Sequence, residues 1–186
     1  MPARTQDELY RTVAEAAQRT LPDYQALYQG LTLEQLNWKP DAKRWSIGQV
    51  LDHLYLQEKI YPPRILAACQ TVGPRPAGAT FRSGLLGGYL TRLVAPGGKP
   101  VPTVKLLEPR ASQYDWAIVE KWERLQADFL RALEAAADRD LRPACIPWAV
   151  TKLVRFRLGD ILLLEVAHKQ RHLEQIVRLK QQMGAL

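Results

Sequence analysis

Hydrophobic residues recur every three or four positions in four long stretches of the chain, the spacing of α-helices that bury one face. The first stretch begins at Thr5-x-x-Glu8, which has the form of a capping box, and we expect Pro22 to kink or interrupt its helix and Gly30 to end it. Its apolar face carries Leu9, Val13, Ala16 and Ala17.

The second stretch has the clearest helix start. Ser46 is the expected N-cap and Gln49 its reciprocal partner, while Trp45 and Val50 occupy the positions of a hydrophobic staple. We expect Pro62-Pro63 to break or kink this helix near its end. Before it, Thr32-x-x-Gln35 predicts one short extra turn. The apolar stripe consists of Ile47, Val50, Leu54, Tyr61 and Ile65.

Two further helices are expected in the second half of the chain. One runs from about Ser112 to Asp138, and the other begins at Asp160 as N-cap and runs to Met183. Between them, Thr151 to Leu158 alternates weakly and is compatible with a short strand or an extended loop. The apolar face of the earlier helix carries Ile118, Trp122, Leu125, Phe129, Leu133 and Ala136.

Residues 73–109 interrupt the helical pattern with seven glycines and six prolines. This composition excludes a long helix, although Phe81 to Val94 has the pattern of a short amphipathic segment. A connection of this length is typical of a functional or partly mobile crossover. The predicted fold class is therefore all-α: a single domain over residues 1–186, built as a four-helix bundle with a long Pro/Gly-rich crossover between its second and third helices.

Composition and charge narrow the class of protein. The chain has 186 residues, of which 47% are hydrophobic and 24% charged, and no apolar run could span a bilayer. Cys69 and Cys145 are too few for a disulfide framework, so we expect buried packing roles for both and a cytoplasmic protein. The net charge of +7 is concentrated in residues 61–110, which sum to +6. That surface could attract an anionic molecule or nucleic acid, or could serve solubility alone.

The candidate chemistry lies in the three histidines. His168 and His172 are four residues apart, so both imidazoles lie on one helix face, which also carries apolar residues. Two neutral imidazoles that point into a core need partners, and a divalent metal ion would supply one. His53, on another helix, is the candidate third ligand. Three protein ligands leave a coordination position open, as in catalytic metal sites, although buried structural histidines are the simpler alternative.

Three polar side chains lie one turn from these histidines. Gln57, Glu165 and Gln175 are candidates for orienting the imidazoles, and Glu165 is also a candidate catalytic group. Glu165 could instead be a carboxylate at the surface edge of its helix that pairs with Lys169 at i+4. Because only one Glu-x-x-His motif is present, the pattern favours one metal ion over a di-iron centre.

Several of these residues together resemble the DinB/YfiT-like superfamily of metal-binding four-helix bundles. The resemblance rests on Leu36-Asn37-Trp38-x-Pro40, on the block Trp45-Ser46-Ile47-Gly48-Gln49-Val50-Leu51-Asp52-His53-Leu54, and on His168-x-x-x-His172-Leu173-x-Gln175-Ile176. The stretch from Pro100 to Pro109 is also similar. The resemblance implies that His53, His168 and His172 surround a nickel, zinc or similar ion.

The resemblance also implies a function class. Characterised relatives include S-transferases and an isomerase that use low-molecular-weight thiols, and others are described as metal-dependent hydrolases. We therefore expect a metal-dependent enzyme that acts on a small, anionic or electrophilic molecule, with a thiol as a candidate cosubstrate and with a homodimer as its assembly. The competing hypothesis is a non-catalytic stress-response or DNA-damage-response module whose basic surface binds nucleic acid or a protein partner.

Overall fold

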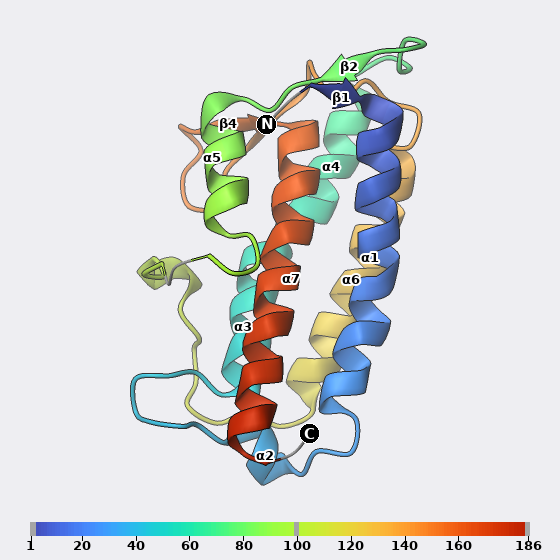
Figure 1. Cartoon of the computed structure of the whole chain (residues 1–186). Helices are drawn as coiled ribbons and strands as arrows, with labels where there is room; N and C mark the ends of the chain where they lie inside the picture. The colour runs from blue at the N-terminus through green and yellow to red at the C-terminus, as the bar shows by residue number, and fades with distance from the viewer. Residues whose placement is uncertain (1–2, 99–100, 185–186) are drawn as a thin grey trace.

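The computed structural model of the chain is mostly helical and describes residues 3–98 and 101–184 (Figure 1). Residues 99–100 of the predicted crossover, and both ends of the predicted domain, lie outside the described residues. The helical elements are α1 (Gln6–Tyr28), α2 (Leu33–Asn37), α3 (Ile47–Glu58), α4 (Tyr61–Gln70), α5 (Leu85–Leu93), the 3-10 turn η1 (Lys105–Leu107), α6 (Ala117–Ala135) and α7 (Leu158–Gln182). The strands are β1 (Arg4–Thr5), β2 (Thr80–Phe81), β3 (Cys145–Pro147) and β4 (Arg155–Arg157).

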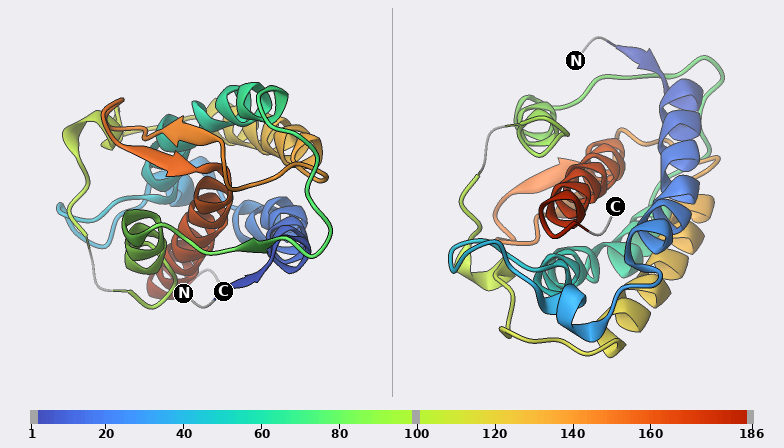
Figure 2. Two further views of the ribbon diagram at one scale, coloured as in Figure 1. Left: turned by 90° about the horizontal axis from the view of Figure 1, so that it is seen from above. Right: turned by 60° about the horizontal axis from the view of Figure 1, so that its bottom comes forward.

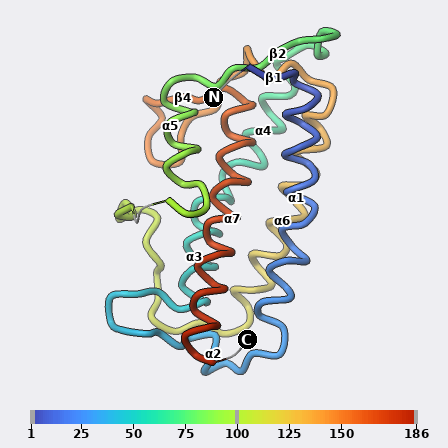
Figure 3. Tube along the Cα trace, viewed as in Figure 1, coloured from blue at the N-terminus to red at the C-terminus, as the bar shows by residue number. Residues whose placement is uncertain are grey.

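The long helices lie side by side, as the backbone trace shows (Figure 3). Helix α1 packs against α7 and α6, and α3 packs against α6 and α7. Helix α4 follows α3 closely and also packs on α6, while α5 from the crossover lies against α7 (Figure 2). Helix α7 therefore contacts both α3 and α5, which places the crossover close to the helices that carry the histidines.

Local sequence signals account for the starts of three helices. Thr5, Thr32 and Ser46 each form the predicted capping box, in which the side chain accepts from the backbone N–H three residues later. Gly30 has a φ of +79°, a left-handed conformation that suits glycine and follows the end of α1. Pro22, however, does not interrupt α1, which continues to Tyr28; packing against α6 and α7 supports the helix on both sides of this residue.

Two other predicted boundaries differ in the structure. The helical stretch does break at Pro62 and Pro63, as expected, but the break divides it into two helices and does not lie near its end: α3 ends at Glu58, and both prolines lie in the first turn of α4, where a missing N–H costs no helical hydrogen bond. Asp160 is not the N-cap of α7, because the helix begins at Leu158. Its carboxylate instead accepts from the Gly84 N–H at 3.2 Å, which joins the start of α7 to the start of α5.

The remaining sequence expectations are partly met. The predicted helix over residues 112–138 is present as the shorter α6, and the segment over residues 151–158 contains β4, which pairs antiparallel with β3. The amphipathic segment over residues 81–94 contains α5. A Cβ atom on Gly87 would lie 2.5 Å from the Asp160 carboxyl carbon, so only glycine permits α5 to approach α7 this closely.

The buried residues form two apolar clusters with a polar layer between them. One cluster surrounds Phe129 and the other surrounds Trp122, so both include residues from α6. Between these clusters, α3, α6 and α7 contribute buried polar side chains: Gln57, Glu58, Gln126, His168, Lys169 and His172. No helix among residues 3–98 and 101–184 is long and apolar enough to cross a bilayer.

Candidate metal centre

The structure brings the three histidines together. His53 lies in the middle of α3, and His168 and His172 lie one turn apart on the neighbouring face of α7. All three side chains are buried, with exposed fractions of 5%, 9% and 6%. His168 lies beside His172 because residues four apart share one face of a helix. His53 joins them because α3 packs against α7.

The Nε2 atoms of the three imidazoles converge on one point. His168 Nε2 lies 3.3 Å from His53 Nε2 and 3.0 Å from His172 Nε2. A tetrahedral ion with metal–nitrogen distances of about 2.0–2.1 Å holds its ligand nitrogens about 3.3–3.4 Å apart. One ligand atom from each residue lies within 4.8 Å of the others, so three ligands of the type and spacing that zinc or nickel prefers are present.

Hydrogen bonds to the other ring nitrogens determine two of the tautomers. His53 Nδ1 lies 2.7 Å from the Leu107 carbonyl, which only accepts, so Nδ1 donates and the Nε2 lone pair is free. His172 Nδ1 lies 2.8 Å from Gln175 Oε1 in the same arrangement. Two lone pairs therefore point toward His168 Nε2. Since one N–H from His168 could satisfy only one of them well, a cation fits this geometry better than three imidazoles alone.

Burial keeps the three imidazoles in the neutral form that binds metals. Burial lowers the pKa of His53, which the hydrogen bond to Leu107 opposes in part. Burial, then the neighbouring His172 and His53, lowers the pKa of His168 well below its ordinary value. Burial and His53 lower the pKa of His172 to about 3. At neutral pH, metal binding at this cluster would therefore require no release of protons from imidazolium groups.

A cavity of about 270 Å³ adjoins the histidine cluster. All three histidines line it, together with side chains from α5, the segment after α5, the β3–β4 region and α7. The apolar members of the lining are Leu90, Leu93, Val94, Val101, Pro102, Val104, Leu107, Trp148, Val150 and Leu164. The open side of the cluster thus faces a space that could hold a small molecule.

The three predicted polar neighbours occupy different positions. Gln175 contacts His172, as described above. Gln57 lines the cavity but donates from Nε2 to Glu165 Oε1 at 2.7 Å, so its hydrogen bond orients a carboxyl group and not an imidazole. Glu165 is fully buried and does not line the cavity, an arrangement that suits a positioning role behind Gln57 better than a catalytic one.

The alternative reading of Glu165 as a surface-edge carboxylate that pairs with Lys169 is wrong. Lys169 Nζ forms its ion pair with Glu58 Oε2 at 3.4 Å, and both side chains are buried. Glu58 Oε2 also accepts from Gln126 Nε2 at 3.0 Å. Burial, together with the charge on Glu58, raises the pKa of Glu165 to about 8, so this carboxyl keeps its proton at neutral pH.

Sequence reasoning missed two parts of this region. The first is the Leu107 carbonyl, a backbone group that carries no residue-type signal. The second is the buried polar cluster of Glu58, Gln126 and Lys169. Its only sequence signal is the position of these residues at the borders of the apolar stripes, a position that surface residues also occupy.

Other candidate groups lie outside the centre. Cys69 is buried as expected, but Cys145 is exposed on β3, and neither lines the cavity. No described arginine or lysine of residues 75–110 lines the cavity. Arg75, for example, contacts Asp7 and the Ala137 carbonyl at the far end of the structure from α2.

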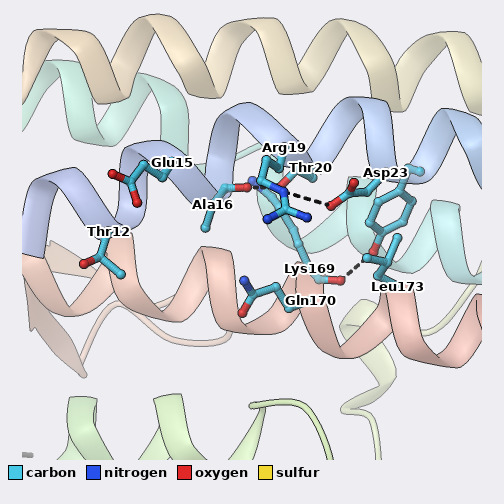
Figure 4. Close-up of a pocket in the computed structure, with 10 residues that line it drawn as sticks. Thr12, Glu15, Ala16, Arg19, Thr20, Asp23, Lys169, Gln170 and Leu173 are labelled. Atoms are coloured by element: carbon cyan, nitrogen blue, oxygen red, sulfur yellow. Dashed lines mark hydrogen bonds and ion pairs between the residues drawn. The ribbon is translucent and has the colours of Figure 1, made fainter.

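A separate hollow of about 320 Å³ lies between α1 and α7 (Figure 4). Its walls are mainly polar surface residues of α1, and Arg19 and Asp23 form an ion pair across one turn of that helix at 4.0 Å. No histidine or cysteine lines this hollow. Among the described residues, the ligand types expected of a metal centre therefore occur together at the His53 cluster.

Fold and site together define a mostly helical protein with a buried cluster of three histidines that could bind a divalent metal ion. A model of the DinB superfamily matches residues 16–176, and the chain belongs to this superfamily. The matched range includes all three histidines. Searches of curated proteins and of solved structures gave no significant match.

Proposed function

We propose that the chain is a metal-dependent enzyme of the DinB superfamily that binds one divalent transition metal, zinc or nickel, through His53, His168 and His172. The convergence of three Nε2 atoms beside a cavity is the observation that carries this proposal. The reaction class is thiol-dependent S-transfer or hydrolysis of a small molecule. The packing of α1, α3, α6 and α7 supports the four-helix bundle that we propose as the architecture.

When bound, such an ion supplies Lewis acidity, which favours deprotonation of a thiol or water near neutral pH. The chain's own residues hold and orient the site. Leu107 and Gln175 fix the tautomers of His53 and His172, so that both Nε2 lone pairs face the centre. Apolar side chains form most of the cavity wall beside the open side of the site, and a less polar surrounding strengthens electrostatic interactions there.

Metal content tests the proposal directly. Protein purified without a histidine tag or chelator should contain about one equivalent of a transition metal by elemental analysis. His168→Ala, which removes the central nitrogen of the cluster, should lose it. Gln170→Ala is a matched control, because Gln170 is an exposed residue on the same helix. Circular dichroism would establish that both variants fold.

Two results would contradict the proposed metal site: full metal content in His168→Ala, or wild-type protein that contains no metal and takes up neither zinc nor nickel. For metal-loaded protein, a panel of thiol-transfer and ester-hydrolysis substrates, assayed with and without chelator, tests the reaction class. The homodimer, the cytoplasmic location, the anionic substrate and the nucleic-acid alternative stay predictions from the sequence.

A further inference from the structure

The cavity beside the histidines is apolar apart from a few groups. Side chains from four separate segments form its walls: Leu93 at the end of α5, Val104 before η1, Trp148 after β3 and Leu164 on α7. These residues are far apart in the sequence, so their apolar character is not the by-product of one hydrophobic stretch. A ligand that enters this space must exchange water for hydrocarbon on most of its surface.

Two polar side chains of the lining, Arg171 and Gln57, have structural partners. Arg171 Nη1 donates to the carbonyl oxygens of Leu93 and Ala95, at 3.3 and 3.2 Å, and so ties the end of α5 to α7. Gln57 donates to Glu165. Thr103 is the remaining uncharged polar residue of the wall outside the histidines. Arg171, the one cationic side chain among the described residues of the lining, is therefore already engaged by carbonyl groups at the rim.

The described basic residues of the crossover supply no charge to the cavity. Arg82, Arg92, Lys105 and Arg110 are exposed, and none of them lines it. Among these described residues, an anionic group buried against the apolar walls would therefore find no counter-charge. Burial of an unpaired carboxylate in an apolar environment costs several kcal/mol, whereas burial of an alkyl or aryl group is favourable.

We propose that the ligand of this site is a small molecule with an apolar body and a single donor group for the metal, and not a molecule with an anionic far end. This inference rests on the proposed metal site and names its substrate class. The cavity of about 270 Å³ has room for such a body, since an apolar cavity of about 150 Å³ can hold benzene. The described basic residues of the crossover then lie on the outer surface and do not contact the ligand.

Two hydroxamates with the same donor and the same chain length provide matched probes. Pentanohydroxamate ends in a methyl group, and glutarate monohydroxamate ends in a carboxylate. Calorimetric titration of the zinc-loaded protein should show that pentanohydroxamate binds at least about tenfold more tightly. Equal affinity, or tighter binding of the carboxylate probe, would overturn the proposal and assign an anion-binding role to Arg171.

A charge introduced into the wall should reverse the preference. Leu93→Arg places a guanidinium in the cavity, so the preference for pentanohydroxamate should fall about tenfold or invert. Leu85→Arg is the matched control on the same helix, because Leu85 is 97% exposed and lies outside the lining. A control that changes the preference as strongly as Leu93→Arg would contradict the assignment of the cavity.

Toluene, which has no donor group, tests the cavity in protein without zinc. It should raise the melting temperature of the metal-free wild type and of Leu85→Arg, but not of Leu93→Arg. Zinc content is measured first for every sample, so failure of the metal site is seen separately from failure of the apolar cavity. If toluene stabilises none of the proteins, the apolar-ligand inference is wrong even where zinc binds.

Discussion

Two buried polar clusters share α3 and α7 but differ in how their partners are supplied. The histidine cluster brings three neutral nitrogen donors together at the edge of a cavity. The second cluster, about one turn further along α3, pairs the Glu58 carboxylate with the Lys169 ammonium and with Gln126 of α6. Phe129 covers Lys169 Nζ at 3.5 Å from the ring centroid, which closes this cluster from the other side.

This difference shows which of the two clusters needs a bound ion to satisfy its buried polar atoms. Burial raises the pKa of Glu58, and the Lys169 ammonium and Gln126 oppose this shift, so the cost of burying the carboxylate is partly offset by partners within the protein itself. Three imidazoles cannot satisfy one another in this way, because two of them present lone pairs to the third. On the same two helices, the Glu58–Lys169 cluster therefore contributes to the stability of the fold, and the histidine cluster is suited to bind an ion.

The largest expected effect on stability comes from breaking the ion pair. Lys169→Met leaves Glu58 buried without its cation, so the free energy of unfolding of the metal-free protein should fall by about 3–5 kcal/mol. Urea denaturation measures this change in the free energy of unfolding. The control is Lys121→Met, because Lys121 is exposed on α6. The double variant Glu58→Gln/Lys169→Met should recover part of the loss. A loss below about 1 kcal/mol in the single variant would mean that the pair is not needed.

The next effect concerns the orientation of a metal ligand. Gln175→Ala removes the acceptor for His172 Nδ1–H, and zinc affinity should fall about 10–100-fold without a change in stoichiometry. Gln175→Glu keeps an acceptor at the same position and should retain most of the affinity. Competition with a chromophoric chelator measures both, and Gln181→Ala, at an exposed position of α7, is the control. Unchanged affinity in Gln175→Ala would show that the contact does not orient the imidazole.

The smallest expected effect is a difference in pH dependence between His172 of the histidine cluster and Glu165, which lies beside the Glu58–Lys169 cluster. The folded-state pKa of Glu165 is raised to about 8, so the folded protein binds more protons than the unfolded chain above about pH 4.5, and stability is lost as pH rises toward 8. The folded-state pKa of His172 is lowered to about 3. Its contribution to the free energy of unfolding is therefore fully present above about pH 6.5 and is lost as pH falls toward 3.

Between pH 6.5 and 8 the contribution of Glu165 should therefore dominate. The free energy of unfolding of the metal-free wild type should fall by about 1–2 kcal/mol over this interval, and that of Glu165→Gln should stay nearly constant. Urea denaturation at several pH values provides the comparison. Parallel curves for the two proteins would show that Glu165 titrates near its ordinary pKa.

Much of the helical framework could be predicted because its signals are local. The capping boxes at Thr5, Thr32 and Ser46 satisfy N–H groups within three residues, so sequence alone identifies these helix starts. Asp160 carried the same kind of signal, but it lies in the first turn of α7 and not at its N-cap. Its carboxylate interacts both with the backbone of Arg157, the N-cap of its own helix, and with the N–H of Gly84 from the crossover. Residue type alone therefore does not identify the capping position within a first turn.

In the candidate site, too, local relationships could be predicted from the sequence and contacts between helices could not. Helical periodicity alone places His168 beside His172, and this relationship follows from their spacing of four. His53 was a candidate third ligand because it is the one other histidine of the chain and lies on a different helix, and the family resemblance implied the same residue, but no local rule places it beside the pair. The roles of Gln57 and Glu165 were not predictable, since side chains one turn from a ligand can point toward it or toward a neighbouring helix, and here they contact each other.

By itself, the sequence determined the helical periodicity, the starts of α1, α2 and α3 and the shared face of two histidines, because each depends on groups a few residues apart. Tertiary structure alone decided that α3 delivers His53 to that face, that the Leu107 carbonyl orients it from 54 residues away, and that Lys169 pairs with Glu58. The physical reason is burial. Once water is excluded, each polar group takes the partner that packing brings within reach, whatever its distance along the chain.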